Sequence, residues 1–217
     1  MRKPLLGFLR DQAAAAHAAY GPYRVLDVGC GRKQYKPLFA PYASSYIGVD
    51  HVDNPTAELK GAIEELPIED GSFDVVICSQ VLEHCDDPVK AVSELRRVTS
   101  PGGRVLATTH GVMPYHPSPT DYWRWTHSGL EKLFAESAAW ESVRVTPSSG
   151  TTACLGMLIS IYLDLAFRRI RLGLAAKPVI AMINTVAMAV DGRSTSLRDP
   201  GPSGLFANFH VVAEAQR

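Results

Sequence analysis

The stretch Val25–Gly31 constrains the fold of this chain more than any other, because an apolar run leads directly into a glycine turn. Residues Arg24–Val28 are predicted to form a buried parallel strand. Glycine at positions 29 and 31 lets the backbone turn sharply and approach a ligand with no side chain in between. A strand with such a turn and a following helix is the first unit of nucleotide-binding α/β folds. By itself, the pattern also fits an ordinary strand-to-helix turn.

A second short strand favours the nucleotide-binding interpretation. Tyr46–Asp50 is mostly apolar and closes on an acid, about twenty residues after the first strand. This spacing places a carboxylate on the ribose hydroxyls in dinucleotide-binding folds. An earlier acid, Asp27, lies inside the first apolar run, where a carboxylate is costly to bury without a partner. We therefore expect Asp27 and Asp50 to lie near a bound cofactor.

Four further motifs follow these two strands: Glu64–Pro67, Gly71–Asp74, Val81–His84 and Pro101–Gly103. In order and spacing, the six stretches together resemble class I S-adenosylmethionine-dependent methyltransferases of the methyltransferase 11 type. The resemblance covers residues 22–140. It implies an α/β fold with a Rossmann-like seven-stranded sheet, helices on both faces, and S-adenosylmethionine as the cofactor. A later run, Asp121–Thr126, together with Tyr115–Pro117, resembles a subgroup often associated with cell-surface polysaccharide biosynthesis.

The resemblance also implies which residues bind the cofactor. In the family, the acid at the end of the second strand binds both ribose hydroxyls, and the following residue stacks on adenine. These roles fall to Asp50 and His51, while Ile63 is expected to offer its backbone N–H and an apolar face to the ring. The full expected set is Asp27, Gly29, Cys30, Gly31, Asp50, His51, Ile63, Ser79 and Gln80.

Two positions depart from the family pattern. Lys33 stands where many members have a third glycine, and Ala62 stands where many have an aspartate that contacts the adenine amino group. Alanine cannot accept that hydrogen bond. A non-catalytic protein that keeps the fold therefore remains one alternative. A nicotinamide-dependent oxidoreductase is another, although the G-x-G-x-x-G pattern of that class is missing.

The residues after the predicted strand 104–109 are the candidates for catalysis. Methyl transfer is an in-line displacement, so the protein mainly aligns the reacting atoms, and an oxygen nucleophile also needs its proton removed. His110, His116 and Asp121 fall in a long loop expected over the methyl group, which favours an oxygen acceptor. His110 is the best single candidate for the base because a strand end fixes it. A purely structural histidine is an equal alternative.

The same loop, Gly111–Trp125, is rich in aromatic residues, and a loop this long in a compact domain is usually functional or disordered. The aromatic density argues against disorder. Its side chains could stack on and hydrogen-bond a small-molecule or glycan-type acceptor, including a lipid-linked one, or could form the loop's own small core. The residues proposed to bind the acceptor are Tyr115, Tyr122, Trp123 and Arg124.

Three helices are expected to pack on the sheet. The first covers residues 4–20 and ends at Gly21. The family resemblance implies that such a helix covers the cofactor site, and a packing helix with no ligand contact is an equal alternative. A capping-box pattern that begins at Ser128 predicts another. A third begins at Pro88, after a cap at residue 86 or 87, with one apolar face towards the sheet: Val89, Val92, Leu95 and Val98.

The last third of the chain is expected to add a helical hairpin to a single domain that spans residues 1–217. Residues 142–146 and 209–213 are predicted as the final antiparallel strands, with the hairpin at 152–190 between them. Both apolar stretches of the hairpin carry polar interruptions and are near or below the ~20 residues of a clean membrane span. A transmembrane hairpin is therefore disfavoured. The alternatives are a cap over the acceptor site, a homodimer surface and a peripheral membrane contact.

Composition excludes some functions. Lysine plus arginine and aspartate plus glutamate both number 22, so the net charge is zero, which argues against a large basic surface for nucleic acid. The scattered cysteines contain no CxxC pair, so neither a metal site nor a disulfide framework is supported. The N-terminus has no signal-peptide pattern. We therefore expect a cytoplasmic protein, with membrane association through the hairpin left open.

Overall fold

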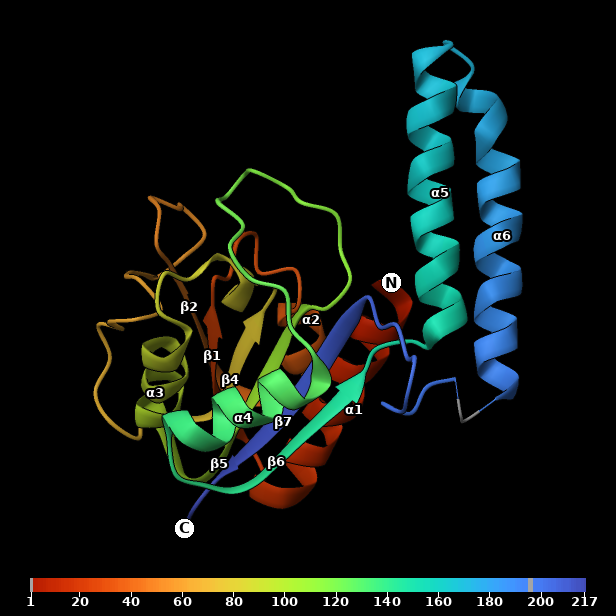
Figure 1. Ribbon diagram of the computed structural model, residues 1–217. Coiled ribbons are helices and arrows are strands. Elements are labelled where there is room, and N and C mark those ends of the chain that lie inside the picture. Colours follow the sequence, from red (N-terminus) through yellow and green to blue (C-terminus); the bar gives the residue numbers. More distant parts are fainter. Residues whose placement is uncertain (1, 195–196) are drawn as a thin grey trace.

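In the computed structural model, which describes residues 2–194 and 197–217, seven strands form one mixed sheet in the order β3-β2-β1-β4-β5-β7-β6 (Figure 1). Strand β7 is antiparallel to both of its neighbours, and the other pairs are parallel. The sequence-based expectation of a seven-stranded Rossmann-like sheet is confirmed. The strands are β1 Tyr23–Val28, β2 Ala43–Asp50, β3 Leu59–Lys60, β4 Phe73–Ser79, β5 Thr99–His110, β6 Trp140–Pro147 and β7 Asn208–Ala215.

Helices cover both faces of this sheet, as expected (Figure 1). The long α1 (Arg2–Tyr20) and the short α2 (Lys36–Phe39) lie on one face, where Leu9 and Ala13 are fully buried against it. On the other face, α3 (Pro88–Val98) and α4 (His127–Ser137) bury a second apolar cluster that contains Leu95 and Phe134. A single 3₁₀ turn, η1 (Leu82–His84), follows β4.

The strand order places a crevice at the carboxyl edge of the sheet. Strand β1 pairs in parallel with β2 on one side and with β4 on the other, so the chain changes direction across the sheet at β1. Ligands of open α/β sheets bind at such a switch point, outside the carboxyl ends of the strands. The turns after β1, β2 and β4 all meet there, and they carry most of the predicted cofactor residues.

Two predictions need correction: one about the buried face of α3 and one about the start of α4. The predicted cap of α3 is confirmed, since Asp87 accepts the N–H of Lys90 at 3.0 Å. Val89, however, is 52% exposed rather than buried. Residues three apart advance by about 300°, so an i+3 series drifts around the helix and its first member leaves the buried face.

The start of α4 also differs from the prediction. The helix begins at His127, and its cap is Thr126, whose hydroxyl accepts the N–H of Gly129 at 3.0 Å. The capping box predicted at Ser128 is therefore wrong by two residues. Thr126 has the extended backbone of an N-cap residue and an oxygen that satisfies a first-turn N–H, which Ser128 inside the helix cannot do.

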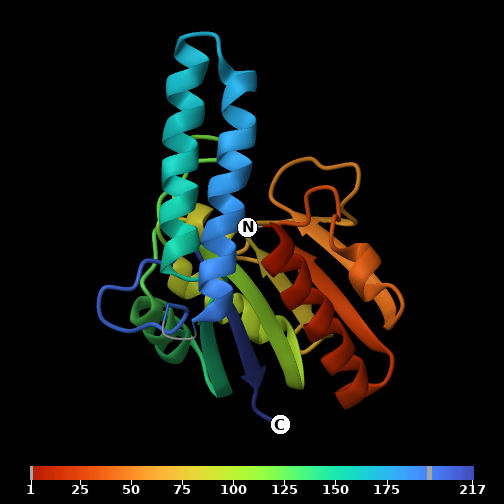
Figure 2. The ribbon, with the colours of Figure 1, turned by 90° about the vertical axis from the view of Figure 1, so that its right-hand side faces the viewer.

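The predicted hairpin forms between β6 and β7. It consists of α5 (Thr151–Arg169) and α6 (Gly173–Arg193), which stand beside the sheet and extend past the loops at its carboxyl edge (Figures 1 and 2). Gly156 allows close approach of the two helices, because a Cβ there would lie 2.8 Å from the Cβ of Ala187. At the base, the buried carboxylate of Asp191 accepts the backbone N–H groups of Thr152 and Ala153 at 3.1 and 3.0 Å. The end of α6 thus caps the start of α5.

Candidate cofactor and acceptor site

A cavity of about 290 Å³ lies at the carboxyl ends of β1, β2 and β4. We call it the glycine-turn cavity, because Gly29 forms part of its wall. Three of the residues predicted to bind the cofactor line it: Gly29, His51 and Ile63. Its other walls come from the segments after β3 and β4, and from the loop that follows β5.

The turn itself requires glycine at position 29. Gly29 has φ +66°, and a Cβ there would lie 2.4 Å from a methyl carbon of Val81. The backbone N–H groups of Gly29 and Cys30 both donate to the carbonyl of Val49, at 2.9 and 3.2 Å. These bonds fix the turn against β2. Gly31 has φ +49°, and no atom lies within 4 Å of the place that a Cβ would take, so its backbone faces open space.

Asp50 lies at the end of β2, directly across from this turn. One carboxylate oxygen is 3.3 Å from the N–H of Gly31 and accepts the side-chain amide of Asn54 at 2.9 Å. The other oxygen is 3.3 Å from Nδ1 of His51. Asn54 also donates to the carbonyl of Gly31 at 2.7 Å, so it ties the two turns together. Asn54 was not predicted, and its only sequence signal is its place in a turn-rich loop after the acid.

Asp27 lies beneath the turn, in the interior of the sheet, and Cys30 within the turn is buried. Asp27 is 1% exposed and accepts a hydrogen bond of 2.6 Å from the hydroxyl of Tyr46. Burial raises the pKa of Asp27 to about 7, although the bond from Tyr46 opposes the rise. Burial likewise raises the pKa of the Cys30 thiol to about 11, which leaves it as an inert thiol. Tyr46 is the partner that the buried acid requires.

The departure at Lys33 does not block the turn. Lys33 itself adopts the left-handed backbone, with φ +50°, that a glycine commonly supplies. Its ammonium group forms an ion pair with Glu58, which also accepts the N–H of Gly48 at 2.6 Å. The lysine side chain therefore lies against β2, and its charge is neutralised there.

A second cavity, of about 280 Å³, lies on the other side of the β1 and β4 ends, and we call it the β7-side cavity. Polar side chains form part of its wall: Gln80 donates to the Thr108 hydroxyl at 3.1 Å. Behind them, Ser79 Oγ lies 3.0 Å from the Tyr35 hydroxyl and 2.8 Å from Thr108 Oγ1. Of the predicted cofactor residues, Gln80 thus lines this cavity rather than the first, and Ser79 lies behind its wall.

The β7-side cavity also contains residues that were not predicted from the sequence. Leu5 and Leu6 of α1 line it, together with Asn208 and His210 of β7. His210 is 7% exposed and stacks on the ring of Phe8, with the ring centroids 4.3 Å apart. Burial lowers the pKa of His210 to about 4, so its imidazole is neutral at neutral pH. The alternation of Asn208 and His210 within a buried strand was the available sequence signal.

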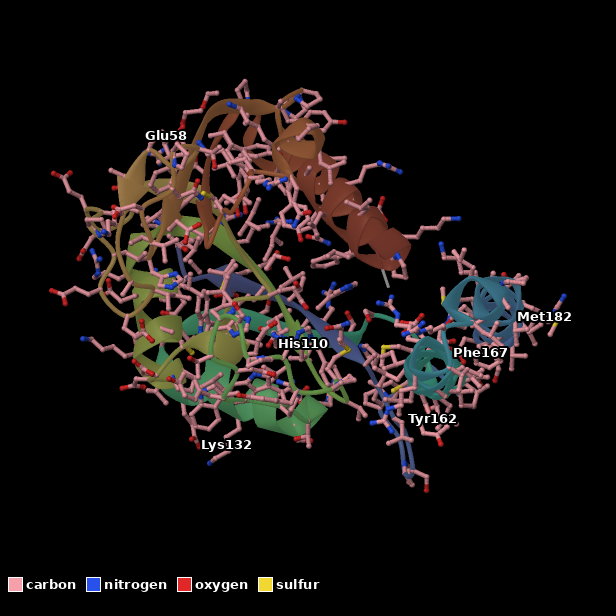
Figure 3. The ribbon with its side chains drawn as sticks, turned by 90° about the horizontal axis from the view of Figure 1, so that it is seen from above. Glu58, His110, Lys132, Tyr162, Phe167 and Met182 are labelled. Atoms are coloured by element: carbon pink, nitrogen blue, oxygen red, sulfur yellow. The ribbon has the colours of Figure 1, made fainter. Side chains whose placement is uncertain are left out.

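A cluster of titratable groups lies between the two cavities, around His110. Nδ1 of His110 is 2.7 Å from the amide oxygen of Asn208. Its Nε2 is 3.1 Å from Oε1 of Glu83 and 3.2 Å from Nε2 of His116. Asn208 lines the β7-side cavity, and His116 packs edge-on against His84, which lines the glycine-turn cavity. The labelled His110 in Figure 3 lies over the middle of the sheet.

Glu83 gives this cluster its chemical character. Its side chain is fully buried, and its second oxygen accepts the Thr109 hydroxyl at 2.9 Å. With Nδ1 of His110 donating to Asn208, Nε2 faces both a carboxylate and a second imidazole. Oε1 of Glu83, although 3.1 Å from Nε2, is buried and accepts no hydrogen bond from the described residues, and a buried carboxylate stabilises a neighbouring imidazolium. Glu83 was part of a recognised motif but had no predicted role.

Of the predicted catalytic residues, His116 is the one that a ligand can reach. The His110 residue is 6% exposed, whereas the side chain of His116 is 37% exposed. Asp121 is held by other residues: both of its oxygens bind Arg124, and it accepts the N–H of His116 at 3.1 Å. The hydrogen bonds from Arg124 hold the pKa of Asp121 well below its ordinary range. These contacts anchor the loop.

The residues predicted to bind the acceptor do not act as a group. Tyr122 lines the glycine-turn cavity, while Tyr115 is 70% exposed. Trp123 donates to the carbonyl of Cys85 at 2.8 Å and stacks on the ring of Trp125. Arg124 donates to the carbonyls of residues 113 and 114 in addition to its ion pair. Trp123 and Arg124 therefore bind residues within and next to the loop, although Trp123 is 37% exposed, so the choice between acceptor binding and a small loop core stays a prediction.

Comparison with known proteins agrees with this geometry. Residues 26–107 match the family model described as a methyltransferase domain. A probable S-adenosylmethionine-dependent methyltransferase of Mycolicibacterium smegmatis is 36% identical over 103 residues, which are 43% of this chain and 40% of that protein. A ubiquinone biosynthesis O-methyltransferase of Pseudomonas aeruginosa is 32% identical over 104 residues, or 40% and 44% of the two chains. The crystal structure of YcgJ from Bacillus subtilis matches all of both chains, with a TM-score of 0.57 and 20% identity.

These findings place the chain by segment and by fold. Residues 26–107 match the methyltransferase domain model, and the whole chain has the fold of the solved class I methyltransferases, which confirms the resemblance seen in the motifs. The matched regions cover only about two fifths of the length of the curated relatives. The subgroup suggested by Asp121–Thr126 stays a prediction.

Proposed function

We propose that this chain is an S-adenosylmethionine-dependent methyltransferase that methylates an oxygen atom of a small-molecule or glycan-type acceptor. The observation that carries the proposal is the pair of cavities that flank Gly29 and Gln80, with the His110 cluster between them. The glycine-turn cavity suits a nucleoside, and the β7-side cavity suits an acceptor. The His110 cluster can take a proton where the two cavities meet.

The residues around the glycine-turn cavity fit the cofactor. The backbone at Gly31 faces open space, Asp50 presents a carboxylate at the strand end, and Ile63 supplies an apolar wall. We assign Asp50 to the ribose hydroxyls, His51 and Ile63 to the adenine ring, and Gln80 to the methionine end. When bound, S-adenosylmethionine supplies a methyl group that is already activated on a sulfonium. The remaining task of the protein is to position the acceptor and remove its proton.

We assign that proton transfer to His116, supported by His110 and Glu83. His116 is the partly exposed member of the cluster, and its Nε2 lies 3.2 Å from that of His110. His110 is held by Asn208, and Glu83 offsets the positive charge that a transferred proton brings. A positioned histidine of this kind typically contributes about 10²–10⁴-fold to such a reaction.

Two resemblances bear on the class of acceptor. The Pseudomonas relative is named an O-methyltransferase, which agrees with an oxygen acceptor. The glycan-type acceptor rests on the resemblance of Asp121–Thr126 to a polysaccharide-associated subgroup. Tyr122 lines the glycine-turn cavity rather than the β7-side cavity, so on this proposal its ring lies on the cofactor side of the site. We further propose a cytoplasmic location, with α5–α6 as the surface for a membrane or a second copy.

One set of experiments tests the proposal. Calorimetry with S-adenosylmethionine, its demethylated product and NAD should show binding of the first two only. Cofactor carrying a labelled methyl group, incubated with fractions of a cell extract that include glycans and lipids, should label one fraction. Binding of NAD instead would favour an oxidoreductase. Cofactor binding with no transfer to any fraction would favour a non-catalytic protein of the same fold.

A further inference from the structure

The hairpin exposes apolar side chains that no other part of the described chain covers. We define its shaft as residues 151–167 and 178–190. Every exposed residue of the shaft is apolar except Tyr162 and Thr185, and the Thr185 hydroxyl donates to the carbonyl of Ala181 at 2.8 Å. Figure 3, which looks down on the hairpin, shows Tyr162 and Met182 on the outer sides of their helices.

Both helices are long and apolar enough to cross a membrane, with mean hydropathies of 1.3 and 1.6. The core helix of a soluble protein can be equally long and apolar, but such a helix is mostly buried. Here only 22% of the residues in the apolar stretch of α5, and 11% of those in the apolar stretch of α6, are buried. The helices also lie far from the N-terminus, which excludes a signal sequence. The apolar surface therefore needs another partner.

The spread of exposed positions distinguishes lipid from a second protein. At about 100° per residue, the exposed positions on α6, from Met188 round to Val190, cover about 200° of the helix circumference. A helix that packs in a bundle needs an apolar stripe only somewhat wider than about 100°, with polar residues on the opposite side. The shaft of α6 has no such polar side. For α6, a solvent that surrounds the helix matches this pattern better than one packed partner.

Apart from Asp164, the charged residues of the hairpin lie at its two ends. Arg168, Arg169 and Arg171 are exposed at the turn between the helices, and Lys177 is exposed one turn later. Asp164, the acid in the distal part of α5, forms an ion pair of 2.8 Å with Arg168. The uncharged part of α5 before it is comparable in length to much of the ~30 Å hydrocarbon core of a bilayer, and long basic side chains can extend to the phosphates.

We infer that the α5–α6 hairpin inserts into a lipid bilayer and that its basic tip contacts anionic phospholipid headgroups. The loop after β5 extends on the same side of the sheet as the tip, and it carries the exposed Tyr115 (Figure 1). Tyrosine is enriched at membrane interfaces. The β7-side cavity lies near the hairpin base, because Ser148 in its wall precedes the α5 cap by two residues. On the proposed function, a lipid-linked acceptor then has a short path to the site.

The test is flotation of the intact protein with vesicles, without cofactor or acceptor, so that its outcome is independent of methyl transfer. We expect the protein to float with phosphatidylcholine vesicles that contain phosphatidylglycerol. Met182→Lys should lower vesicle partition about a hundredfold, because a charge replaces an exposed apolar group within the membrane. Val89→Lys is the matched control: it adds the same charge at an exposed valine on α3 and should float like the wild type.

A second variant tests the basic tip. Replacing Arg168, Arg169 and Arg171 with glutamine should weaken the preference for anionic vesicles by about fivefold per arginine. An intact protein that stays in the unbound fraction with phosphatidylcholine vesicles, both with and without phosphatidylglycerol, overturns the inference, as does Met182→Lys that floats like the wild type. Light scattering that shows a detergent-free dimer, disrupted by Met182→Lys and without vesicle binding, would assign the hairpin to a second copy instead.

Discussion

The two cavities at the carboxyl edge are built in different ways. The glycine-turn cavity is lined by residues between positions 28 and 122, most of them inside the segment that matches the family model. The β7-side cavity is lined by residues from position 5 to position 210, drawn from α1, from the turns after β1 and β4, and from β7. The first depends on backbone turns at strand ends, and the second on side chains from distant parts of the chain.

This difference explains why cofactor and acceptor differ in how readily they can be assigned. A turn such as Gly29–Gly31 has a local sequence signal, because only glycine tolerates the backbone angle and the contact with Val81. Leu5 and His210 meet only after the whole sheet has formed. On the proposed function, the glycine-turn cavity can therefore serve many relatives, while the β7-side cavity belongs to the individual chain.

The strongest test of the first cavity is Gly29→Val. A branched side chain at φ +66° would strain the backbone and collide with Val81. We expect loss of S-adenosylmethionine binding in calorimetry, while circular dichroism still shows a folded protein. Gly7→Val is the control, since no atom lies within 4 Å of a Cβ at that position. Normal cofactor binding by Gly29→Val would place the cofactor elsewhere.

The next largest effect is expected at the His110 cluster, which lies between the two cavities. His116→Gln and His110→Gln should each lower the turnover number by about 10²–10⁴-fold, with cofactor binding retained. Transfer of a labelled methyl group to the active extract fraction measures the turnover number. Calorimetry measures cofactor binding. His17→Gln, on α1 and stacked on Tyr42, is the control and should leave turnover unchanged. Equal turnover in all three variants would show that the acceptor needs no base from this cluster.

A smaller effect is expected at the ribose position. Asp50→Ala removes charge-assisted hydrogen bonds to two hydroxyls and should weaken S-adenosylmethionine binding by about 1.5–3 kcal/mol. Asp53→Ala provides the matched control, because its carboxylate lies in the same loop, is 92% exposed and pairs with Lys60. Calorimetry compares the two. Unchanged affinity in Asp50→Ala would remove Asp50 from the site.

The sequence predicted the sheet and the first cavity because both have local signals. Apolar runs of strand length, glycine turns and the acid at the end of β2 each follow from neighbouring residues. The structure placed Gly29, His51 and Ile63 in one cavity, as the family resemblance implied. The hairpin was also predictable, since its two apolar stretches exceed what the sheet needs to cover its faces.

The remainder depends on contacts that the sequence does not encode locally. Glu83 lies in a recognised motif, yet its proximity to His110 depends on how η1 packs on the end of β5. Arg124 was predicted to bind an acceptor. A cation three residues after Asp121 can equally bind that acid, and in the structure Arg124 forms an ion pair with Asp121. The helix start at Thr126 shows a similar competition between two nearby hydroxyl residues.

The last prediction concerns the β7-side cavity and the neutral His210 in its wall. An unfolded histidine binds a proton below a pKa of about 6.5, whereas in the folded chain burial lowers the pKa of His210 to about 4. Between these values the unfolded state binds more protons, so the free energy of unfolding falls as the pH falls. By about pH 5 the loss should be about 2 kcal/mol relative to about pH 8.

His210→Gln has no proton to bind, so urea unfolding of wild type and variant at several pH values isolates this contribution from those of other groups. The variant loses the contact with Phe8 and should be less stable at the higher pH, and the gap should narrow towards the lower one. A gap that stays constant with pH would mean that His210 is protonated as easily as a solvent-exposed histidine, and that the cavity is wetter than its walls indicate.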